Sequence, residues 1–326
     1  FLLPYRKSSL NVDFGKWRES YISHIIRNMK SATVSVIGRP SSGKSTLVNT
    51  ICGMKVSITS PTPQTTRNKI RGIYTDTRGQ LVFTDTPGYH LSDKEINRRM
   101  QDVTVSALKD SDLILYLVDG KRRKGKEEEA IARMISLSKV PTVVAINKLD
   151  ILSEEDKKEA EESVKAALPS SPVLFLSAKE DQGVDEVLIE LFRLAGEGEL
   201  LYDESQYTDQ DLEFRISEII REKTISSLTD ELPHVIYVDV ADLEWNEDTN
   251  TVWIRAFINV ERPGQTGFIV GRGGANIKRI GTEARKEIRQ IFPGATVRLD
   301  LQVKTAEKWR QNSIVLDKVF RNDRRK

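Results

Sequence analysis

Because of what this 326-residue sequence lacks, an internal disulfide bond is excluded and a membrane-spanning segment is not expected. Its single cysteine, Cys52, cannot form an internal disulfide, and we expect a small buried residue in a reducing compartment. No apolar run approaches the ~18 residues that cross a bilayer, so we expect no membrane span. Internal repeats and low-complexity tracts are missing as well. With 38% hydrophobic and 30% charged residues, the composition is that of an ordinary globular protein.

A strong excess of one charge is also missing, because the formal net charge is only +2. The charge is nevertheless unevenly distributed. Residues 261–326 contain 16 Lys and Arg against 7 Asp and Glu, which gives this segment +9 and leaves −7 for the other 260 residues. An acidic body with a basic C-terminal segment indicates a polyanionic partner for that segment, although a solvated charged surface would have the same composition.

The length favours two domains, and the apolar pattern divides the chain accordingly. From residue 32 to about 195, short β-branched runs alternate with amphipathic stretches, which predicts a parallel sheet covered by helices on both faces. The expected strands are 32–37, 69–75, 80–84, 112–118, 141–146 and 172–176. The expected helices are 44–52, 94–109, 126–138, 154–167 and 184–195.

A second unit follows. We expect a first domain at 29–196, an acidic linker at 197–210 and a second domain at 211–326. The second domain is expected to contain a helix at 211–228, strands near 234–243 and 250–260, a Gly-rich turn at 271–274, a helix at 275–291 and a strand at 296–304. With a short helix before the turn, the order is α-β-β-α-α-β.

Residues 1–28 form an N-terminal extension, which is either a targeting segment or the product of a wrongly assigned start upstream of Met29.

A motif of the form G-x-x-x-x-G-K-S/T lies where the first expected strand meets the first helix. Its glycines let the backbone wrap around an anion, and the helix N-terminus adds a favourable dipole. In such a loop Lys44 would reach the β- and γ-phosphates, and the Ser45 hydroxyl would bind Mg²⁺. The expected phosphate-binding residues are Gly38, Arg39, Pro40, Ser41, Ser42, Gly43, Lys44, Ser45 and Thr46.

A second motif, Asp85-Thr86-Pro87-Gly88 followed by Tyr89, ends the expected strand at 80–84. Its aspartate can hold Mg²⁺ directly or through water, and Gly88 leaves its backbone N–H free to approach a γ-phosphate. A plain strand-to-turn sequence would look similar, but the position about 40 residues after the phosphate loop favours the functional interpretation.

Guanine recognition is predicted from two further strand ends, Asn147-Lys148-Leu149-Asp150 and Ser177-Ala178-Lys179. A carboxylate at Asp150 can accept hydrogen bonds from N1–H and N2–H₂ of guanine, whereas adenine lacks this donor pair. Asn147 can tie neighbouring loops together, the Lys148 stem can lie along the base, and a backbone N–H of the second motif can meet guanine O6. A polar cap on the next helix is the structural alternative for the first motif.

In order and spacing, these four motifs resemble the translation-factor class of GTPases. In that class a threonine between the first two motifs binds Mg²⁺ and senses the γ-phosphate. The resemblance assigns this role to Thr66, which directly precedes Arg67, with Thr65 as the alternative. The loop at 57–70 would therefore be the switch, ordered by the γ-phosphate and released on hydrolysis.

The second domain carries the G-x-x-G sequence Gly271-Arg272-Gly273-Gly274. Such loops clamp about four nucleotides in KH domains, while a simple helix–turn–helix connection is the structural alternative. Arg272 and Lys278 would neutralise phosphates, and an apolar groove beside the loop would take unstacked bases. The expected RNA-binding residues are Ile269, Gly271, Arg272, Gly273, Gly274, Ile277, Lys278, Arg279 and Ile280.

A GTPase domain followed by a KH domain resembles the Era family of ribosome-assembly GTPases. The likeness covers about residues 29–310 and includes the segments 58–60, 64–67, 218–223 and 280–286. It implies an α/β P-loop GTPase with a mostly parallel sheet, followed by an α/β KH domain of type II. It also implies GTP hydrolysis with Mg²⁺, binding to 16S-type rRNA near its 3′ end, and a role in assembly of the small ribosomal subunit.

The resemblance further implies a cytoplasmic protein, with loose association at the inner face of the cell membrane in some members; we expect a monomer. The sequence departs from the family at two motifs. Ser41-Ser42 replaces Asn-Val, and because that asparagine helps hold potassium in relatives, a K⁺ cofactor stays open. The KH loop has Gly-Arg-Gly-Gly in place of the common Gly-Asn-Lys-Gly.

The predicted mechanism lacks an obvious residue to orient the attacking water. Tyr89 occupies the position where many small GTPases carry glutamine, and Tyr74 and Arg67 are the remaining candidates. We therefore expect slow intrinsic hydrolysis that a cation, a loop rearrangement or a partner accelerates. Two alternatives stay open: an RNA-binding module whose GTP domain barely hydrolyses, and a tRNA-modifying GTPase.

Overall fold

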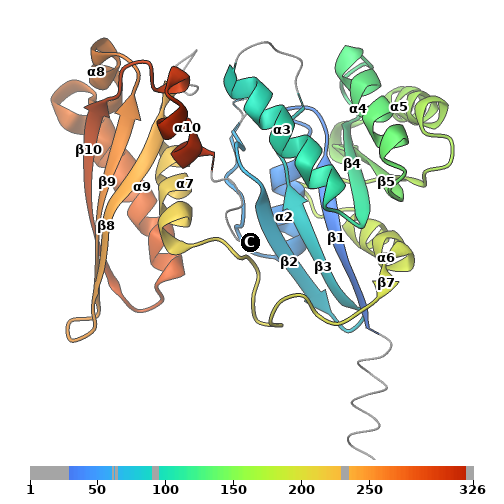
Figure 1. Ribbon diagram of the computed structural model, residues 1–326, viewed down its shortest axis with the longest axis horizontal. Coiled ribbons are helices and arrows are strands. Elements are labelled where there is room, and N and C mark those ends of the chain that lie inside the picture. The colour runs from blue at the N-terminus through green and yellow to red at the C-terminus, as the bar shows by residue number, and fades with distance from the viewer. Residues whose placement is uncertain (1–28, 61, 63–64, 90–94, 229–234, 321–326) are drawn as a thin grey trace, which may run out of the picture.

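The computed structural model describes residues 29–60, 62, 65–89, 95–228 and 235–320. It contains two α/β bodies, and the segment that joins them runs along the lower side of the view in Figure 1. The predicted N-terminal extension 1–28 lies outside the described residues, as does His90 after Tyr89. In the described residues, no helix is both long enough and apolar enough to span a membrane.

The first body is a mixed sheet with the strand order β2-β3-β1-β4-β5-β6. Only the β2–β3 pair and the short β1–β7 pair are antiparallel, as expected for a mostly parallel sheet. The strands are β1 (Lys30–Ile37), β2 (Ile70–Asp76), β3 (Gly79–Asp85), β4 (Leu113–Asp119), β5 (Thr142–Asn147), β6 (Val173–Phe175) and β7 (Gly196–Glu197). Every residue of β4 and β5 is buried, which explains why these strands have no polar alternation.

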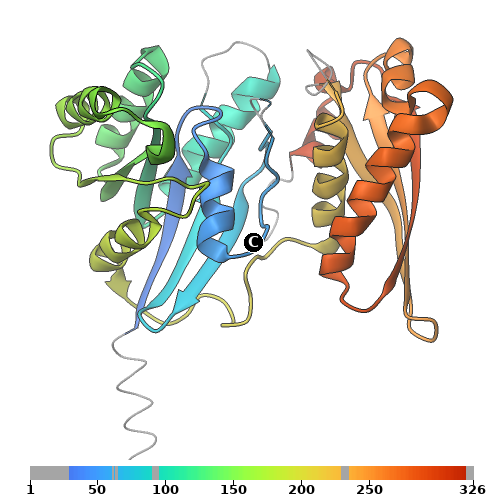
Figure 2. The ribbon, with the colours of Figure 1, turned by 180° about the vertical axis from the view of Figure 1, so that it is seen from behind.

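Helices cover both faces of this sheet (Figures 1 and 2). They are α2 (Lys44–Cys52), α3 (Glu95–Lys109), α4 (Lys126–Ser138), α5 (Glu154–Ala167) and α6 (Val184–Leu194), with a short 3₁₀ turn at Leu149–Ile151. One core cluster lies under α2 and α6, and a second lies under α4 and α5. Because both faces are covered, functional groups gather at the carboxyl edge of the strands.

The second body is a three-stranded sheet, β10-β9-β8, with helices on one face. Its elements are α7 (Leu212–Ile225), β8 (Tyr237–Asn246), β9 (Thr251–Val260), α8 (Thr266–Val270), α9 (Ala275–Ile291) and β10 (Thr296–Thr305). Val252, Ile254, Ala256 and Ile258 alternate along β9 and are fully buried under the helices. Figures 1 and 2 show that α7 faces the first body while the sheet lies on the far side.

The predicted linker 197–210 is not a free tether. Gln80 of β3 donates to Tyr202 O and accepts from the Leu201 and Tyr202 amides. The Thr208 hydroxyl donates to Arg71 O, and Ile73 N–H donates to Tyr207 O. These contacts fasten the segment along the edge strand β2, so the second body begins from a fixed position.

The C-terminal elements were not anticipated from the sequence. A 3₁₀ turn (Trp309–Gln311) and helix α10 (Ser313–Val319) follow β10. Trp309, Leu316 and Phe320 form a buried cluster with Met100 of α3, and Asn68 donates to Val319 O. The last helix of the second body is therefore packed on the first body, beside the predicted switch loop.

Candidate functional site

The phosphate loop joins β1 to α2 with a geometry that requires glycine at two contacts. Gly43 has φ +100°, and a Cβ there would lie 2.2 Å from Asn147 Nδ2. A Cβ on Gly88 would lie 2.6 Å from the backbone of Pro40. The predicted second motif therefore rests directly on the phosphate loop, which also accepts a hydrogen bond from Tyr89 N–H at Gly38 O.

A cavity of about 350 Å³ opens in front of this loop. Residues from the phosphate loop, the switch loop, Gly88 and the guanine motif line it together. The lining residues are Pro40, Ser41, Gly43, Lys44, Ser45, Thr46, Ile58, Thr59, Ser60, Thr62, Thr65, Thr66, Gly88 and Lys148. Three of the four motifs thus contribute to one cavity, as their placement at strand ends predicts.

Lys44 is buried at the base of this cavity, and its ammonium donates to Gly38 O and Arg39 O. Burial lowers the pKa of Lys44 to about 8, against the opposing attraction of the Asp85 carboxylate. A phosphate group would supply the negative charge that favours the protonated lysine. The position suits the predicted contact with the β- and γ-phosphates.

Three oxygen-bearing side chains converge beside Lys44. Ser45 Oγ lies 2.7 Å from Asp85 Oδ2 and 2.9 Å from Thr66 Oγ1, and Thr66 Oγ1 lies 3.4 Å from Asp85 Oδ2. Within the described chain, the buried Asp85 Oδ1 has no hydrogen-bond partner. Hard oxygen ligands and an unsatisfied carboxylate oxygen are what Mg²⁺ requires, so these residues fit the predicted magnesium ion.

The two adjacent threonines of the switch loop have different environments. Thr66 belongs to the oxygen cluster, whereas the Thr65 hydroxyl donates to Thr62 O at 2.6 Å. The geometry therefore favours Thr66 over the alternative Thr65 for the metal position. Both side chains are largely buried, so their roles do not exchange without movement of the loop.

Asn147 connects the phosphate loop to the last motif, as predicted. Its Nδ2 donates to Ser42 O at 2.8 Å, and its Oδ1 accepts from Ala178 N–H at 2.9 Å. The Ala178 amide is thus used internally, which leaves Lys179 N–H as the candidate donor for guanine O6. Ser177 Oγ donates to Asp150 Oδ1 at 2.6 Å and orients this carboxylate.

The structure turns both alternative water-orienting candidates away from the cavity. Arg67 is buried and donates to Ile236 O of the second body, with its guanidinium 5.7 Å from the Trp309 ring centre. Tyr74 donates to Asp76 and contacts the Phe192 ring, on a part of β2 four residues beyond Ile70. Neither side chain can position water at the γ-phosphate, and Arg67 instead fastens the switch loop to the second body.

The G-x-x-G loop presents an open backbone. Gly271, Gly273 and Gly274 all have positive φ, at +73°, +58° and +78°. A Cβ at Gly273 or Gly274 would meet nothing within 4 Å, so this surface is free for close approach by a ligand. Arg272, Lys278 and Arg279 are exposed around it.

The prediction that Ile269 and Ile280 line a groove for bases is wrong. Ile269 and Ile280 have no exposed surface, because both are packed in the core between the sheet and the helices. They hold α8 and α9 in place and cannot touch a base, whereas Ile277 is partly exposed. Phe268, which the sequence analysis missed, is 62% exposed beside the loop and is an apolar surface for a base.

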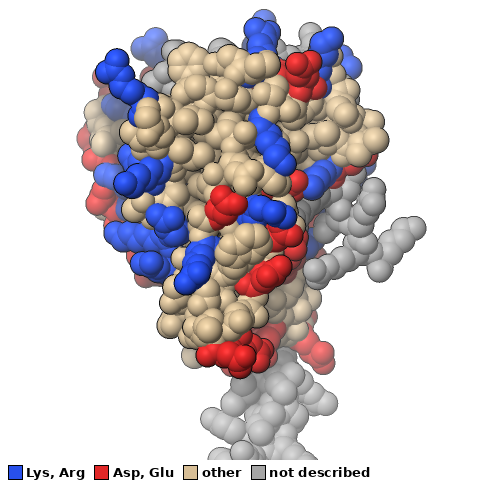
Figure 3. All heavy atoms as spheres, turned by 90° about the vertical axis from the view of Figure 1, so that its left-hand side faces the viewer, with Lys and Arg blue, Asp and Glu red and all other residues tan. Residues whose placement is uncertain are grey.

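Exposed cations continue along α9 beyond the loop. Lys286 and Arg289 lie on the exposed side of this helix together with Lys278 and Arg279. Figure 3 shows Lys and Arg most densely along the left side of the second body, with others at the top and in the middle, where Asp and Glu are also present. The basic charge of the C-terminal segment is therefore concentrated and suits a phosphate backbone.

Two side chains of α7 hold the backbone of the switch loop. Arg221 Nη2 donates to Thr65 O at 2.6 Å, and Glu222 Oε1 accepts from Thr59 N–H at 2.9 Å. Lys55 pairs with Glu222 at 2.5 Å and with Glu287 of α9 at 2.7 Å. Burial alone would raise the pKa of Glu222, but hydrogen bonds from Lys223, Lys55 and Thr59 outweigh it and lower the pKa.

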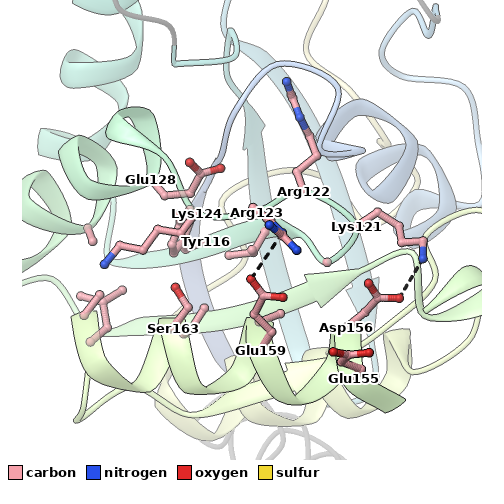
Figure 4. A pocket seen from close by; sticks show the side chains of 17 residues that line it. Tyr116, Lys121, Arg122, Arg123, Lys124, Glu128, Glu155, Asp156, Glu159 and Ser163 are labelled. Carbon is pink, nitrogen blue, oxygen red and sulfur yellow. Dashed lines mark hydrogen bonds and ion pairs between the residues drawn. The ribbon is translucent and has the colours of Figure 1, made fainter. Parts of the chain in front are cut away.

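A second hollow, of about 330 Å³, lies between α4 and α5 and contains none of the predicted motif residues. Lys121, Arg122, Arg123 and Lys124 form one rim, and Figure 4 shows Asp156 and Glu159 facing them from α5. The charges on the two rims pair with each other, as in Lys121–Asp156 at 2.8 Å. The nucleotide motifs therefore point to the other cavity.

Comparison with protein families gives two matches along the chain. A family model described as a 50S ribosome-binding GTPase matches residues 33–148, and one described as a KH domain matches residues 231–310. The chain is 44% identical to GTPase Era of Treponema denticola over 293 residues, which is 89% of this chain and 99% of that relative. It is 45% identical to GTPase Era of Borrelia hermsii, over 87% of this chain and 97% of that relative.

Two solved structures each resemble 90% of this chain. One is a variant of Aquifex aeolicus Era bound to GDP·AlF₄⁻, with a TM-score of 0.85, 30% identity and coverage of 90% of this chain and 99% of that one. The other is Era in complex with MgGDPNP and nucleotides 1506–1542 of 16S ribosomal RNA, with the same TM-score and identity and 98% of that chain covered.

The Asp150 carboxylate leads to a prediction about base specificity. Asp150→Asn should weaken GTP binding by roughly 100-fold or more, because the amide cannot accept from both N1–H and N2–H₂ of guanine. It should strengthen xanthosine triphosphate binding, since xanthine offers an oxygen in place of the N2 amino group. Calorimetric titration with both nucleotides measures this, with exposed Glu155→Gln as the control. An unchanged preference for GTP would contradict the assignment.

The two threonines provide a matched pair of variants for the metal site. Thr66→Ala should weaken Mg²⁺-dependent binding of a non-hydrolysable GTP analogue roughly tenfold, because one oxygen of the cluster is lost. Thr65→Ala removes a hydroxyl of the same loop that donates to Thr62 O and lies outside the oxygen cluster, and should change this binding little. Magnesium titrations of analogue binding compare them. The reverse order of effects would move the metal position to Thr65.

Proposed function

This chain belongs to the Era family of GTPases, and from that premise we propose that it is a GTP-dependent switch in the assembly of the small ribosomal subunit. The first body binds GTP with Mg²⁺ and hydrolyses it to GDP and phosphate. The KH domain binds 16S-type rRNA near its 3′ end. The Era protein that matches 90% of this chain with the same fold is bound to nucleotides 1506–1542 of 16S ribosomal RNA, which supports this partner.

The nucleotide is held by the motif residues in the roles given above. Lys44 contacts the β- and γ-phosphates, while Ser45, Thr66 and Asp85 hold Mg²⁺. Mg²⁺, when bound, neutralises charge on the phosphates in the transition state. Asp150 selects guanine, and Asn147 fixes the relative positions of the phosphate loop and the Ser177–Lys179 loop.

Hydrolysis by the isolated protein is slow in this proposal. Among the described residues that line the cavity, there is no glutamine or histidine to orient water. Tyr89 is partly buried against the core under α4 and α5. A cation, a loop rearrangement or the assembling subunit would then complete the site.

The observation that carries the switch proposal is the double use of residues 57–70. The same loop supplies Thr66 to the metal cluster and gives Thr59 N–H and Thr65 O to α7. A γ-phosphate that orders the loop therefore also fixes the backbone groups that α7 contacts. We propose that the GTP form presents the KH domain to RNA and that hydrolysis permits release.

The proposed place of action is the cytoplasm, where small subunits assemble. Loose association with the inner face of the cell membrane, a monomeric state and stimulation by K⁺ remain expectations of the family resemblance. For potassium, Ser41 offers a shorter side chain than asparagine, although its φ of +64° keeps the loop in the same left-handed turn that asparagine tolerates.

RNA binding by the KH loop is tested at Gly273. Gly273→Asp should abolish RNA binding and leave GDP affinity within about twofold, because a carboxylate at this open position repels the phosphates. Gly273→Asn is the matched control, since asparagine tolerates the same positive φ without charge and should retain measurable affinity. Fluorescence anisotropy with a 3′-terminal 16S rRNA fragment separates the two. Equal binding by wild type and Gly273→Asp would contradict the loop's role.

Coupling between nucleotide and RNA is tested at Lys55. Lys55→Met removes the first-body cation that pairs with Glu222 and Glu287 of the second body, while Lys223 still joins these two carboxylates to each other, so the ratio of RNA affinities with GTP analogue and with GDP should fall roughly tenfold, toward unity. Lys165→Met is the control, because Lys165 pairs with Glu161 on α5 of the first body, outside the switch loop. RNA titrations with each nucleotide measure the ratio. If Lys55→Met and wild type gave the same ratio, this route between the domains would be wrong.

A further inference from the structure

Asp119 is a buried acid beside the nucleotide cavity that belongs to none of the four motifs. It is the last residue of β4 and is paired with Asn147 at the end of β5. Its side chain is 2% exposed. An acid this deeply buried must be compensated by a cation or by hydrogen bonds.

The compensating cation is Lys148 of the guanine motif. Lys148 Nζ lies 2.6 Å from Asp119 Oδ2, and the lysine side chain is 33% exposed. Lys148 has φ +72°, a left-handed conformation that is uncommon for lysine. This backbone turn directs the side chain back across the strand ends, so that Lys148 lines the nucleotide cavity.

The carboxylate of Asp119 is itself immobilised. Oδ1 accepts from Lys121 N–H at 3.1 Å, and Arg122 N–H donates to Asp119 O at 3.0 Å. Gly120 N–H donates to Asn147 O at 3.2 Å. The turn after β4 therefore fixes one oxygen of Asp119, while the other oxygen fixes the ammonium of Lys148.

We propose that Asp119 is a positioning residue for guanine recognition, which acts by anchoring the Lys148 ammonium so that its four-carbon stem forms a wall for the purine ring. The inference rests on the proposed guanine site and adds a residue to it. A lysine side chain is long and rotamer-rich, and ordering it on ligand binding lowers affinity. Because Asp119 orders it in advance, the base meets a preformed apolar surface.

The variant that tests this is Asp119→Asn, which keeps an acceptor for Lys121 N–H but removes the charge. We expect GDP to bind roughly tenfold more weakly in calorimetric titrations, with KM for GTP raised by the same factor and kcat unchanged. The matched control is Asp156→Asn. It breaks the Lys121–Asp156 pair on the same turn, seen in Figure 4, and should leave GDP affinity within about twofold.

A double-mutant cycle with Lys148→Met separates positioning from a merely structural role. If Asp119 acts through Lys148, Asp119→Asn should weaken GDP binding tenfold in wild type but less than twofold in the Lys148→Met background. Additive losses would overturn the proposal, because they would mean that Asp119 only stabilises the turn. An unchanged GDP affinity in Asp119→Asn would overturn it as well.

Two further measurements make these outcomes unambiguous. If Asp119→Asn does not fold, as judged by its thermal unfolding, Asp119→Ser replaces it in the same cycle, because serine keeps a short uncharged acceptor. Wild-type protein is titrated with GDP first. Absence of binding there would refute the guanine site itself, whereas tight binding by both wild type and Asp119→Asn would refute only the role of Asp119.

Discussion

One loop has to satisfy two sets of partners at the same time, and the arrangement of this molecule depends on that constraint. Residues 57–69 form no helix or strand where they are described, so their backbone groups need partners from elsewhere. Thr59 N–H and Thr65 O find them in Glu222 and Arg221 of α7, while the hydroxyl of Thr66 finds Ser45 and Asp85. If the loop satisfied its backbone groups with its own hydrogen bonds, a change at the oxygen cluster of Ser45 and Asp85 would not affect the contacts with α7.

The burial of these α7 side chains makes the contact close to all-or-none. Arg221 and Glu222 are each 3% exposed. Their partners in the loop are the backbone groups Thr65 O and Thr59 N–H, and leaving a buried polar group without its hydrogen bond costs about 1–3 kcal/mol. A small displacement of the switch loop therefore cannot be absorbed gradually: the contacts either persist or are replaced together. Such bistable interfaces are what convert small shifts at a phosphate into movements of whole domains.

The sequence was a good guide to the nucleotide site because that site is built at strand ends. Each motif follows a buried strand, and the sheet brings Lys44, Asp85 and Asn147 together without any long-range information beyond the strand order. Helices 126–138, 154–167 and 275–291 match the expected bounds, because each segment has an apolar periodicity that can be recognised without knowledge of the rest of the chain.

What the sequence did not reveal are the contacts between segments far apart in the chain. Arg67 was one of the remaining candidates for orienting water, yet it donates to Ile236 O, 169 positions away. Ile269 and Ile280 flank the G-x-x-G loop in sequence, but the helical period turns both toward the core. Asp119 belongs to none of the four motifs. Its ion pair with Lys148 depends on the pairing of β4 with β5, which the sequence does not reveal.

Helix α9 shows how these long-range contacts can be used. Its N-terminus follows the G-x-x-G loop, and Glu287, thirteen residues after Gly274, pairs with Lys55 and Lys223 at the domain interface. At 1.5 Å per residue the two points are about 20 Å apart along one continuous helix. A helix packed in a core through Ile280, Ala284 and Ile288 moves as a rigid rod, because its side chains are close-packed against the sheet. A shift of Lys55 beside the switch loop would therefore move α9 and its sheet together and carry the G-x-x-G loop with them, without any local change in the KH core.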